Sequence, residues 1–213
     1  MNARFMDVEL LVERGVLHPR AETELLGATA LEVVSDQPRI IDMCCGSGNL
    51  ACALATHLPG ARVWASDLTD ACVSLARRNV EHTGVANRVT VVQGDLFSGL
   101  RDLEGTIDLI VCNPPYISQA KLAGERAALL ESEPREAFDG GPYGLSIHQR
   151  VVKEALPFLK PGGHLLFEIG LGQERQVGLL FQRSRAYEEL RTVANPAGEV
   201  RVVAARKINQ RGN

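Results

Sequence analysis

The sequence predicts an α/β fold in which helices cover both faces of a doubly wound, mostly parallel sheet. Two observations carry this prediction. Short β-branched or apolar runs alternate with helix-like segments from residue 39 onward, and such alternation favours parallel strands joined by helical crossovers. The chain has 213 residues, 45% of them hydrophobic and 23% charged, which suits one domain with one well-buried core.

The predicted elements follow this alternation along the chain. A strand over 39–45 leads into a helix over 48–58, in which Leu50, Leu54 and Leu58 recur at helical spacing. The next elements are a strand over 61–67, a helix over 71–84 and strands over 88–95 and 106–112. The second half predicts a helix over 144–159, a strand over 163–170, a helix near 172–184 and strands near 188–194 and 199–206.

The first residues predict a short hairpin rather than a second domain. Val8, Leu10 and Val12 alternate along one face, and Gly15 then offers a turn. We expect this hairpin to pack on the main domain.

Composition excludes several classes of function. The net charge is −3 and the sequence pI is about 6.0, which disfavours non-specific nucleic-acid binding. No apolar stretch approaches membrane-spanning length, and the first residues lack a signal-peptide pattern. Five cysteines without zinc-site spacing fit reduced thiols, and the five histidines are scattered. The sequence therefore predicts a cytoplasmic protein with no metal site and no membrane partner, and it leaves the oligomeric state open.

A glycine loop and several strand-end aspartates predict a ligand site. Gly46 and Gly48 lie between a predicted strand and a predicted helix, where they let the backbone and a helix N-terminus approach a ligand. Asp67 ends the next strand, about 20 residues on, where a ribose diol would be held. Asp95 ends the strand after that. Carboxyl ends of parallel strands share one edge of the sheet, so we expect these groups to face one crevice.

The loop by itself fits either a dinucleotide or S-adenosylmethionine. Gly46, Gly48 and Ala51 satisfy the dinucleotide pattern G-x-G-x-x-G/A. The discriminating motif is Asn113-Pro114-Pro115-Tyr116, because hydride transfer has no use for it.

This second motif predicts methyl transfer to a planar nitrogen. Pro114 and Pro115 force the preceding residues into extended conformations and stiffen the corner after a strand. The corner presents two acceptors, the Asn113 side-chain oxygen and the Pro114 backbone carbonyl, beside the Tyr116 ring. Two fixed acceptors orient a carboxamide, a nucleobase amine or a guanidine toward an electrophilic methyl group and stabilise the charge that develops on its N–H bonds.

The chain resembles the HemK/PrmC group of class I S-adenosylmethionine-dependent methyltransferases, which methylate the glutamine side-chain amide of release factors. The similarity extends from about Val16 to Lys207. The segments that carry it are VLHPRAETELL (16–26), IDMCCGSG (41–48), SDLTDACVSLARRN (66–79), GDLF (94–97), NPPYIS (113–118) and EPREAFDGGPYGL (133–145). The resemblance implies a seven-stranded sheet whose last strand is antiparallel, with S-adenosylmethionine as the methyl donor.

Roles for single residues are implied by the same resemblance. The implied cofactor contacts are Asp42, Cys44, the Gly46–Gly48 loop, Asp67 with Leu68 for the ribose, Asp95 with Leu96 for the adenine, and Asn113. Asn113 and Pro114 are implied as acceptors for the amide nitrogen, with Tyr116 as a wall of the site. Arg20, Glu22 and Glu133 are candidates for the substrate side, where carboxylates, including Glu24 and Glu136, would pair with a cationic substrate.

Departures from the family pattern keep other functions open. Only the short hairpin stands where PrmC-type enzymes carry an N-terminal helical domain that engages the release factor. Cys44-Cys45 replaces a Gly-Thr pair, and HPRAET replaces PRPET. A small-molecule N-methyltransferase, acting on a free amide, a guanidine or a natural-product intermediate, is therefore the alternative. Adenine N6-methylation of nucleic acid is disfavoured by the charge, and a non-catalytic cofactor-binding module is disfavoured by the Asn-Pro-Pro-Tyr motif.

We accordingly divide the chain into three parts. Residues 1–20 are assigned to an N-terminal hairpin that caps the substrate side, residues 21–207 to the methyltransferase domain and residues 208–213 to a disordered tail. The expected acceptor is a release-factor-type protein or a small molecule with an amide or guanidine.

Overall fold

The computed structural model describes residues 2–124, 126–131 and 134–209. The strands are β1 (Asn2–Phe5), β2 (Val8–Leu11), β3 (Arg39–Met43), β4 (Arg62–Asp67), β5 (Val89–Gln93), β6 (Ile107–Cys112), β7 (Leu159–Glu168), β8 (Tyr187–Ala194) and β9 (Val200–Lys207). The helices are α1 (Ala21–Val33), α2 (Asn49–His57), α3 (Asp70–His82), α4 (Gln119–Ala123), α5 (Ser146–Glu154) and α6 (Glu174–Ser184). Four 3₁₀ turns join them: η1 (Leu96–Gly99), η2 (Arg101–Leu103), η3 (Ala127–Glu131) and η4 (Arg135–Ala137).

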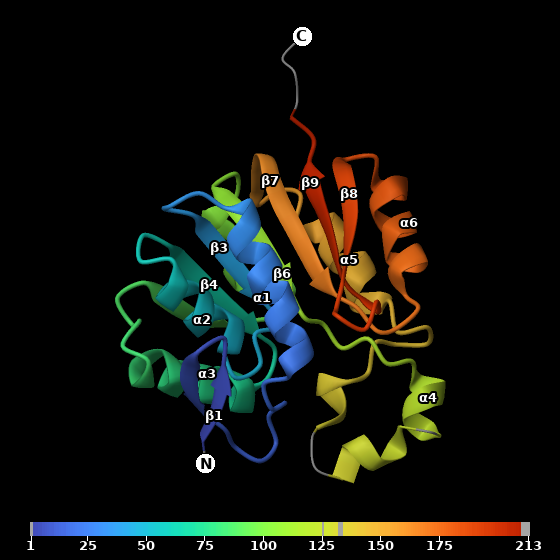
Figure 1. Ribbon diagram of the computed structural model, residues 1–213, viewed down its shortest axis with the longest axis horizontal. Coiled ribbons are helices and arrows are strands. Elements are labelled where there is room, and N and C mark those ends of the chain that lie inside the picture. Colours follow the sequence, from blue (N-terminus) through green and yellow to red (C-terminus); the bar gives the residue numbers. More distant parts are fainter. Residues whose placement is uncertain (1, 125, 132–133, 210–213) are drawn as a thin grey trace.

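Seven strands form one sheet in the order β5-β4-β3-β6-β7-β9-β8 (Figure 1). The pairs β3–β4, β3–β6, β4–β5 and β6–β7 are parallel, whereas β9 runs antiparallel to both β7 and β8. This confirms the mostly parallel seven-stranded sheet and its antiparallel last strand. The strand order reverses beside β3, where a crevice opens at the carboxyl ends of β3 and β6.

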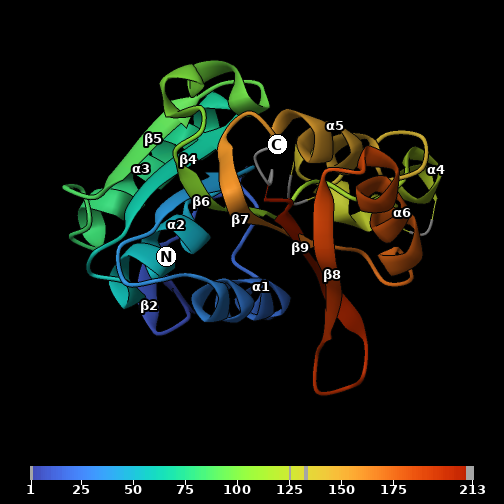
Figure 2. The same ribbon diagram turned by 90° about the horizontal axis from the view of Figure 1, so that it is seen from above.

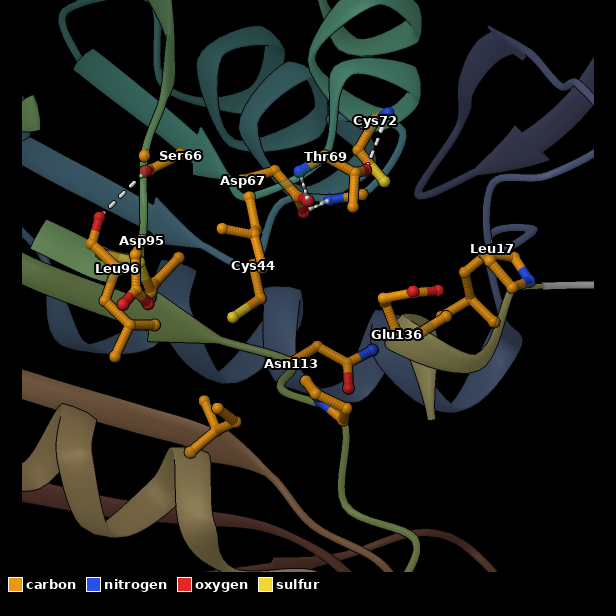
Figure 3. A pocket seen from close by; sticks show the side chains of 18 residues that line it. Leu17, Cys44, Ser66, Asp67, Thr69, Cys72, Asp95, Leu96, Asn113 and Glu136 are labelled. Atoms are coloured by element: carbon orange, nitrogen blue, oxygen red, sulfur yellow. Dashed lines mark hydrogen bonds between the residues drawn. The ribbon is translucent and has the colours of Figure 1, made fainter. Parts of the chain in front are cut away.

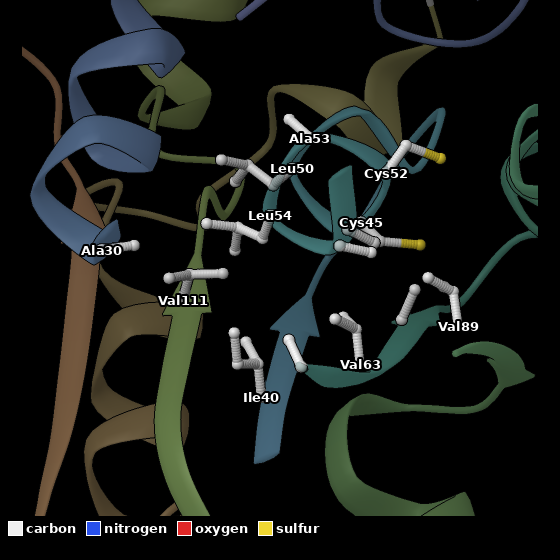
Figure 4. Packing of buried hydrophobic residues seen from close by; sticks show 14 of the residues in the cluster. Ala30, Ile40, Cys45, Leu50, Cys52, Ala53, Leu54, Val63, Val89 and Val111 are labelled. Atoms are coloured by element: carbon white, nitrogen blue, oxygen red, sulfur yellow. The ribbon is translucent and has the colours of Figure 1, made fainter. Parts of the chain in front are cut away.

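Alternating side chains along the central strands build two hydrophobic cores, one on each face. Ile40 and Val111 belong to the core shared with α1, α2 and α3, whereas Ile41 and Ile110 belong to the core shared with α5 and α6. Figure 4 shows the first core, with Leu50 and Leu54 of α2 among the strand side chains. Viewed from above, α1 and α5 lie on opposite sides of the sheet (Figure 2). Neighbouring residues of a strand enter opposite cores because successive side chains of a pleated strand point to opposite faces of the sheet.

The N-terminal hairpin exists, but its predicted turn was wrong. Residues Met6 and Asp7, with φ of 45° and 64°, form the turn between β1 and β2, and Gly15 lies after the second strand. Two consecutive left-handed residues match the twist of a two-residue hairpin, so a Met-Asp pair fills positions where glycine was the expected signal. Phe5 and Leu10 are buried in the core shared with α1, α2 and α3.

Helix α1 was not predicted from the sequence. Its buried face consists of Thr23, Leu26, Gly27, Thr29 and Ala30. These residues are mostly small or polar, so the apolar periodicity that marks a helix is weak there. The helix begins directly after Arg20, and its first turn therefore lies at the ligand edge of the sheet.

Near the end of the chain, the Ile208 amide donates a hydrogen bond to the Ala186 carbonyl. The rest of the predicted tail, residues 210–213, lies outside the described residues. Among the described helices, none is both long and apolar enough to cross a membrane.

Candidate active site

Functional side chains gather where five neighbouring parallel strands end. Cys44 follows β3, Asp67 ends β4, Asp95 follows β5, Asn113 follows β6 and Glu168 ends β7. Figure 3 shows Cys44, Asp67 and Asn113 around one pocket. The sequence-predicted strand ends therefore meet at one crevice, as the topology requires.

The glycine loop is fixed by the aspartate of the neighbouring strand. The Gly46 amide donates to Asp67 Oδ2 at 2.9 Å, and the Thr69 amide donates to Asp67 Oδ1 at 3.2 Å. Cys44 and Gly46 have φ of 59° and 54°, so the chain turns through left-handed conformations immediately beside the pocket. Cys44, Gly46, Asp67 and Thr69 all line this pocket.

Gly48 has a different role from Gly46. It precedes α2 with φ of 75°, and a Cβ built on it would lie 3.1 Å from the Ala76 Cβ of α3. Gly48 is absent from the described linings of the pockets at this edge. Its lack of a side chain serves the packing of α2 against α3.

Asp42 carries a buried oxygen that suits a cationic group. The side chain is 1% exposed, Oδ2 accepts from the Ala51 amide at 2.9 Å, and Oδ1 has no hydrogen-bond partner among the described residues. Burial, with a smaller effect of the Asp67 charge, raises the pKa of Asp42 to about 8. Asp42 lines a pocket with Cys44 and Gly46. An orphaned buried carboxylate oxygen at this place fits the ammonium group of S-adenosylmethionine.

The pocket that Cys44, Gly46, Asp67 and Thr69 line is predominantly apolar further along. Leu68 is 59% exposed and lines it together with Leu96 and Ile147. Leu96 has φ of 49°, and its carbonyl accepts from the Ser66 hydroxyl at 3.1 Å. These surfaces suit a flat adenine ring.

Asp95 lines the same pocket and is held by α5. Arg150 donates to both of its oxygens, at 2.9 and 3.1 Å, and also to Glu154 at 3.0 Å. The fork-shaped contact fixes the carboxylate plane. A carboxylate has lone pairs beyond these two contacts, so it can still accept from an adenine amine.

The Asn113-Pro114 corner stands between two pockets. Asn113 lines both the cofactor-sized pocket and a second pocket, as do Leu17 and Ala137. Asn113 Nδ2 donates to Thr23 Oγ1 at 3.1 Å. Among the described residues, none donates a hydrogen bond to the Asn113 side-chain oxygen or to the Pro114 carbonyl. Two open acceptors thus lie where the pockets meet.

A buried ion pair lies behind the corner. Glu168 is 2% exposed, and Arg201 is 9% exposed. Tyr116 Oη donates to Glu168 Oε1 at 3.4 Å, while Arg201 donates to the Tyr116 hydroxyl at 3.2 Å and to Glu168 Oε1 at 3.4 Å. Burial raises the pKa values of Glu168 and Tyr116. The ring of Tyr116 is thereby fixed as part of the second pocket.

The second pocket carries charges of both signs. Arg20 and Glu22 line it from the start of α1, Arg126 lines it from the loop after α4, and Glu168 and Arg201 line it from the sheet. Arg20 and Glu22 thus lie where a substrate role requires them.

The remaining candidate carboxylates lie in different places. Glu136 lines the first pocket. Glu24 accepts a hydrogen bond from the Met6 amide at 2.8 Å and ties the N-terminal hairpin to α1. Glu133 lies outside the described residues.

The 139–144 loop backs the Asn-Pro-Pro-Tyr corner. The Ile117 amide donates to the Phe138 carbonyl, and the Gly140 amide donates to the Ile117 carbonyl, both at 2.9 Å. A Cβ on Gly140 would meet the Pro115 carbonyl at 2.8 Å, and one on Gly144 would meet the Tyr116 carbonyl at 2.3 Å. Glycines are therefore required for this close approach.

Gln173 joins three segments at this place. Its Nε2 donates to the Tyr116 carbonyl at 2.9 Å and to the Gly144 carbonyl at 3.3 Å, while its Oε1 accepts from the Gly170 amide at 2.9 Å. One amide thereby links the corner, the 139–144 loop and the loop after β7.

Sequence reasoning missed Thr23, Glu168, Gln173 and Arg201. Glu168 and Arg201 had a usable signal, because each is a charged residue inside an otherwise apolar strand run. Buried charges require partners, so such residues predict a pair. Thr23 and Gln173 had no signal in their spacing, because their contacts join segments far apart in the chain.

The fold and the site define a class I methyltransferase. A family model described as a methyltransferase small domain matches residues 22–141. The release factor glutamine methyltransferase of Moorella thermoacetica is 39% identical over 203 residues, which cover 94% of this chain and 71% of that protein. The chain belongs to this HemK/PrmC family and is an S-adenosylmethionine-dependent N-methyltransferase, as the sequence motifs predicted.

Two further similarities agree with this assignment. The ribosomal protein uL3 glutamine methyltransferase of Bradyrhizobium diazoefficiens is 36% identical over 174 residues, which cover 80% of this chain and 54% of that protein. Among solved structures, a methyltransferase from Pyrococcus furiosus has a TM-score of 0.69 at 17% identity, covering 94% of this chain and 89% of the other. This last similarity supports the fold.

Proposed function

We propose that the enzyme transfers a methyl group to the side-chain amide nitrogen of a glutamine in a release-factor-type protein. The observation that carries the proposal is that Asn113 lines two pockets and that no described residue donates a hydrogen bond to its side-chain oxygen or to the Pro114 carbonyl. The release factor glutamine methyltransferases among the relatives support the choice of acceptor. All five cysteines are free, which supports a cytoplasmic location.

The residues at the corner would orient a weak nucleophile. Bound in the first pocket, S-adenosylmethionine supplies an electrophilic methyl group. The Asn113 oxygen and the Pro114 carbonyl each accept one N–H bond of the substrate amide, which directs its nitrogen toward the first pocket. Positive charge grows on those N–H bonds as the new bond forms, so the acceptors stabilise the transition state more than the ground state. Tyr116 provides the adjoining wall, and the proton leaves after transfer.

The proposed cofactor contacts come from the first pocket and from the adjoining pocket that Asp42 lines, since Leu17, Cys44, Gly46 and Asn113 line both. Asp42 would hold the ammonium group, and Cys44 and the Gly46 loop would surround the methionine part. Asp67 would accept from the ribose hydroxyls with Leu68 beside it, and Asp95 would accept from the adenine amine. The Leu96 backbone and side chain would contact the ring. Leu17 and Arg20, which follow the hairpin, would close the substrate side together with Glu22.

A small amide or guanidine is the second candidate acceptor. Glu22 and Glu168 line the same pocket as the corner, beside Arg20, Arg126 and Arg201. A cationic acceptor would pair with Glu22, because Glu168 already faces Arg201. Asn113→Asp separates the candidates, because a carboxylate still accepts hydrogen bonds and adds attraction for a cation. A cationic acceptor would therefore be methylated relatively well by this variant, whereas a neutral glutamine gains nothing.

The deciding assay is transfer of labelled methyl groups to a purified release factor, run beside a panel of free amides, guanidines and amines. We expect label on the glutamine of the release factor. Label that appears in a small molecule and not in the protein would contradict the proposal of a protein acceptor, but methyl transfer to an amide-type nitrogen would remain supported.

Asn113→Ala is the matched control for the chemistry. It should reduce transfer by roughly 10² or more, the scale of one lost preorganised hydrogen bond. S-adenosylhomocysteine affinity should stay within a few-fold, because the first pocket keeps its other contacts. Normal turnover by this variant would contradict the proposed role of the corner.

A further inference from the structure

An amide side chain has two different ends, and the orientation of the Asn113 amide decides which end meets the substrate. The carbonyl oxygen accepts hydrogen bonds, whereas the amide nitrogen donates them. A half-turn of the terminal torsion exchanges the two ends. An Asn113 turned that way would present N–H bonds to the N–H bonds of an acceptor amide, and the two sets of donors would repel each other.

The structure holds the nitrogen end away from the acceptor. Asn113 Nδ2 donates to Thr23 Oγ1 at 3.1 Å. Thr23 lies in the first turn of α1 and is 2% exposed, so water does not compete for its hydroxyl. The opposite end of the amide is then free for the pockets that Asn113 lines.

The polarity of this contact is set by the carboxylate beyond it. A threonine hydroxyl has one proton to donate. Glu168 Oε2 is buried without a hydrogen-bond partner among the described residues, and the Thr23 hydroxyl is close enough to act against the burial that raises the pKa of Glu168. An ionised carboxylate only accepts, so the open Glu168 Oε2 favours a Thr23 proton that points toward it, and the Thr23 oxygen lone pair is left for Asn113 Nδ2.

Polar and charged groups from several elements face Glu168. Arg201 of β9 and the Tyr116 hydroxyl approach Oε1, each at 3.4 Å. His148 of α5 contacts the Glu168 backbone carbonyl at 3.3 Å, and Glu22 of α1 opposes ionisation of the carboxyl. The Glu168 carboxylate, which Arg201 and Tyr116 approach at Oε1, thus lies beyond the hydroxyl that orients Asn113.

We propose that Thr23 is a positioning residue that, with Glu168 behind it, fixes the Asn113 amide so that its oxygen faces the acceptor nitrogen. This inference rests on the proposed role of Asn113 in N-methyl transfer. It gives the start of α1 a function in the reaction in addition to its contacts with the core.

The first test compares Thr23→Val with Thr23→Ser. Valine keeps the shape and removes the hydroxyl, whereas serine keeps the hydroxyl. The substrate is the acceptor that the panel above identifies. Thr23→Val should lower kcat roughly 10- to 100-fold, the scale of a misplaced reacting group, while S-adenosylhomocysteine affinity changes less than about threefold. Thr23→Ser should retain most of the activity. Full activity of Thr23→Val would overturn the proposal.

A double-mutant cycle distinguishes positioning from general damage. In the Asn113→Ala background the amide is absent, so adding Thr23→Val should have almost no further effect. Equal losses in both backgrounds would show that Thr23 does not act through Asn113. The cycle also separates two failures. Normal activity of Asn113→Ala would contradict the proposed function. Reduced activity of Asn113→Ala together with full activity of Thr23→Val would contradict this inference alone.

A readout that needs no substrate is the side-chain NH₂ signal of Asn113 in NMR spectra, assigned by its loss in Asn113→Ala. We expect slow hydrogen exchange in the wild type and in Thr23→Ser, and fast exchange in Thr23→Val. Fast exchange in the wild type would overturn the proposed hydrogen bond.

The role of Glu168 is tested by the pH profile of kcat for Glu168→Gln, measured at saturating S-adenosylmethionine so that the titration of Asp42 in cofactor binding does not contribute. Burial raises the pKa of Glu168. As pH decreases, activity of the wild type should therefore begin to fall at a higher pH than it would for a carboxyl group with an ordinary pKa. Glutamine does not ionise, so this acidic limb should disappear from the variant. An unchanged acidic limb would remove Glu168 from the proposal.

Discussion

At the scale of single residues, the site depends on polar atoms that the protein itself leaves open. Asp42 has one satisfied oxygen and one without a partner among the described residues. Asn113 donates one hydrogen bond through its nitrogen, and no described residue donates to its side-chain oxygen. In both residues one end is fixed by the fold and the other is available to a ligand, which lowers the reorganisation needed on binding.

Asp42 should release a proton when the cofactor binds. Its pKa of about 8 keeps the carboxyl largely protonated at neutral pH in the free protein, and a cationic ammonium group nearby favours the ionised form. S-adenosylhomocysteine binding near pH 7 should therefore release up to one proton and strengthen as pH rises toward 8. Calorimetry in buffers of different ionisation enthalpy measures this release. Asp42→Asn is the control, and the same proton count in that variant would contradict the assignment.

At the scale of elements, the corner after β6 is rigid because other segments enclose it. Gln173 joins the corner to two loops, and the 139–144 loop runs along it. The prolines stiffen the local chain, but the direction in which the corner points is set by these contacts. The motif therefore acts as part of an assembly of loops.

Gly144→Ala should damage this assembly more than a matched glycine substitution elsewhere. Gly144 and Gly84 have nearly equal φ, 72° and 71°, so a left-handed alanine costs about 1–2 kcal/mol at either position. Only at Gly144 would the new Cβ meet a backbone atom, the Tyr116 carbonyl at 2.3 Å, because nothing lies within 4 Å at Gly84. We expect a similar modest loss of thermal stability from backbone strain, with an added loss and reduced methyl transfer only in Gly144→Ala. Equal activities would show that the loop does not position the corner.

The sequence predicted most strands and helices because their apolar periodicity was strong. It also placed Asp67, Asp95 and Asn113 at strand ends, since parallel strands bring their carboxyl ends to one edge. Helix α1 was missed because its buried face is mostly small or polar. The hairpin turn was misplaced because Met6 and Asp7 adopt left-handed conformations without glycine. The pairing of Thr23 with Asn113 spans 90 positions, and no local pattern encodes such a contact.

At the scale of the whole molecule, two buried titratable groups have opposite effects on how stability depends on pH. Burial lowers the pKa of His148 from 6.5 to about 4. Between about pH 4 and pH 6.5 the unfolded chain therefore binds more protons at this residue than the folded chain, and the free energy of unfolding rises with pH. Asp42 has its pKa raised from 3.8 to about 8, so the folded chain binds more protons and stability falls with pH across that window. Above about pH 6.5 only the Asp42 effect of this pair remains.

The ligand-free protein should therefore lose stability as pH rises from about 6.5 to 8. Urea unfolding at a series of pH values measures the free energy of unfolding across this window. Asp42→Asn should flatten the dependence, because an amide does not titrate, and saturating S-adenosylhomocysteine should flatten it too. A wild type whose stability rises over this interval, or a variant with the same slope, would contradict the pKa of Asp42.

The corner that separates two pockets also has a consequence for the order of events in turnover. In the proposed reaction the spent cofactor would occupy the first pocket and the methylated acceptor the second, and Leu17, Asn113 and Ala137 line both. We therefore expect each product to leave without displacing the other. Cofactor exchange can proceed while a docked protein remains in place, so the departure of the acceptor, and not that of the nucleoside, would set the pace of repeated cycles.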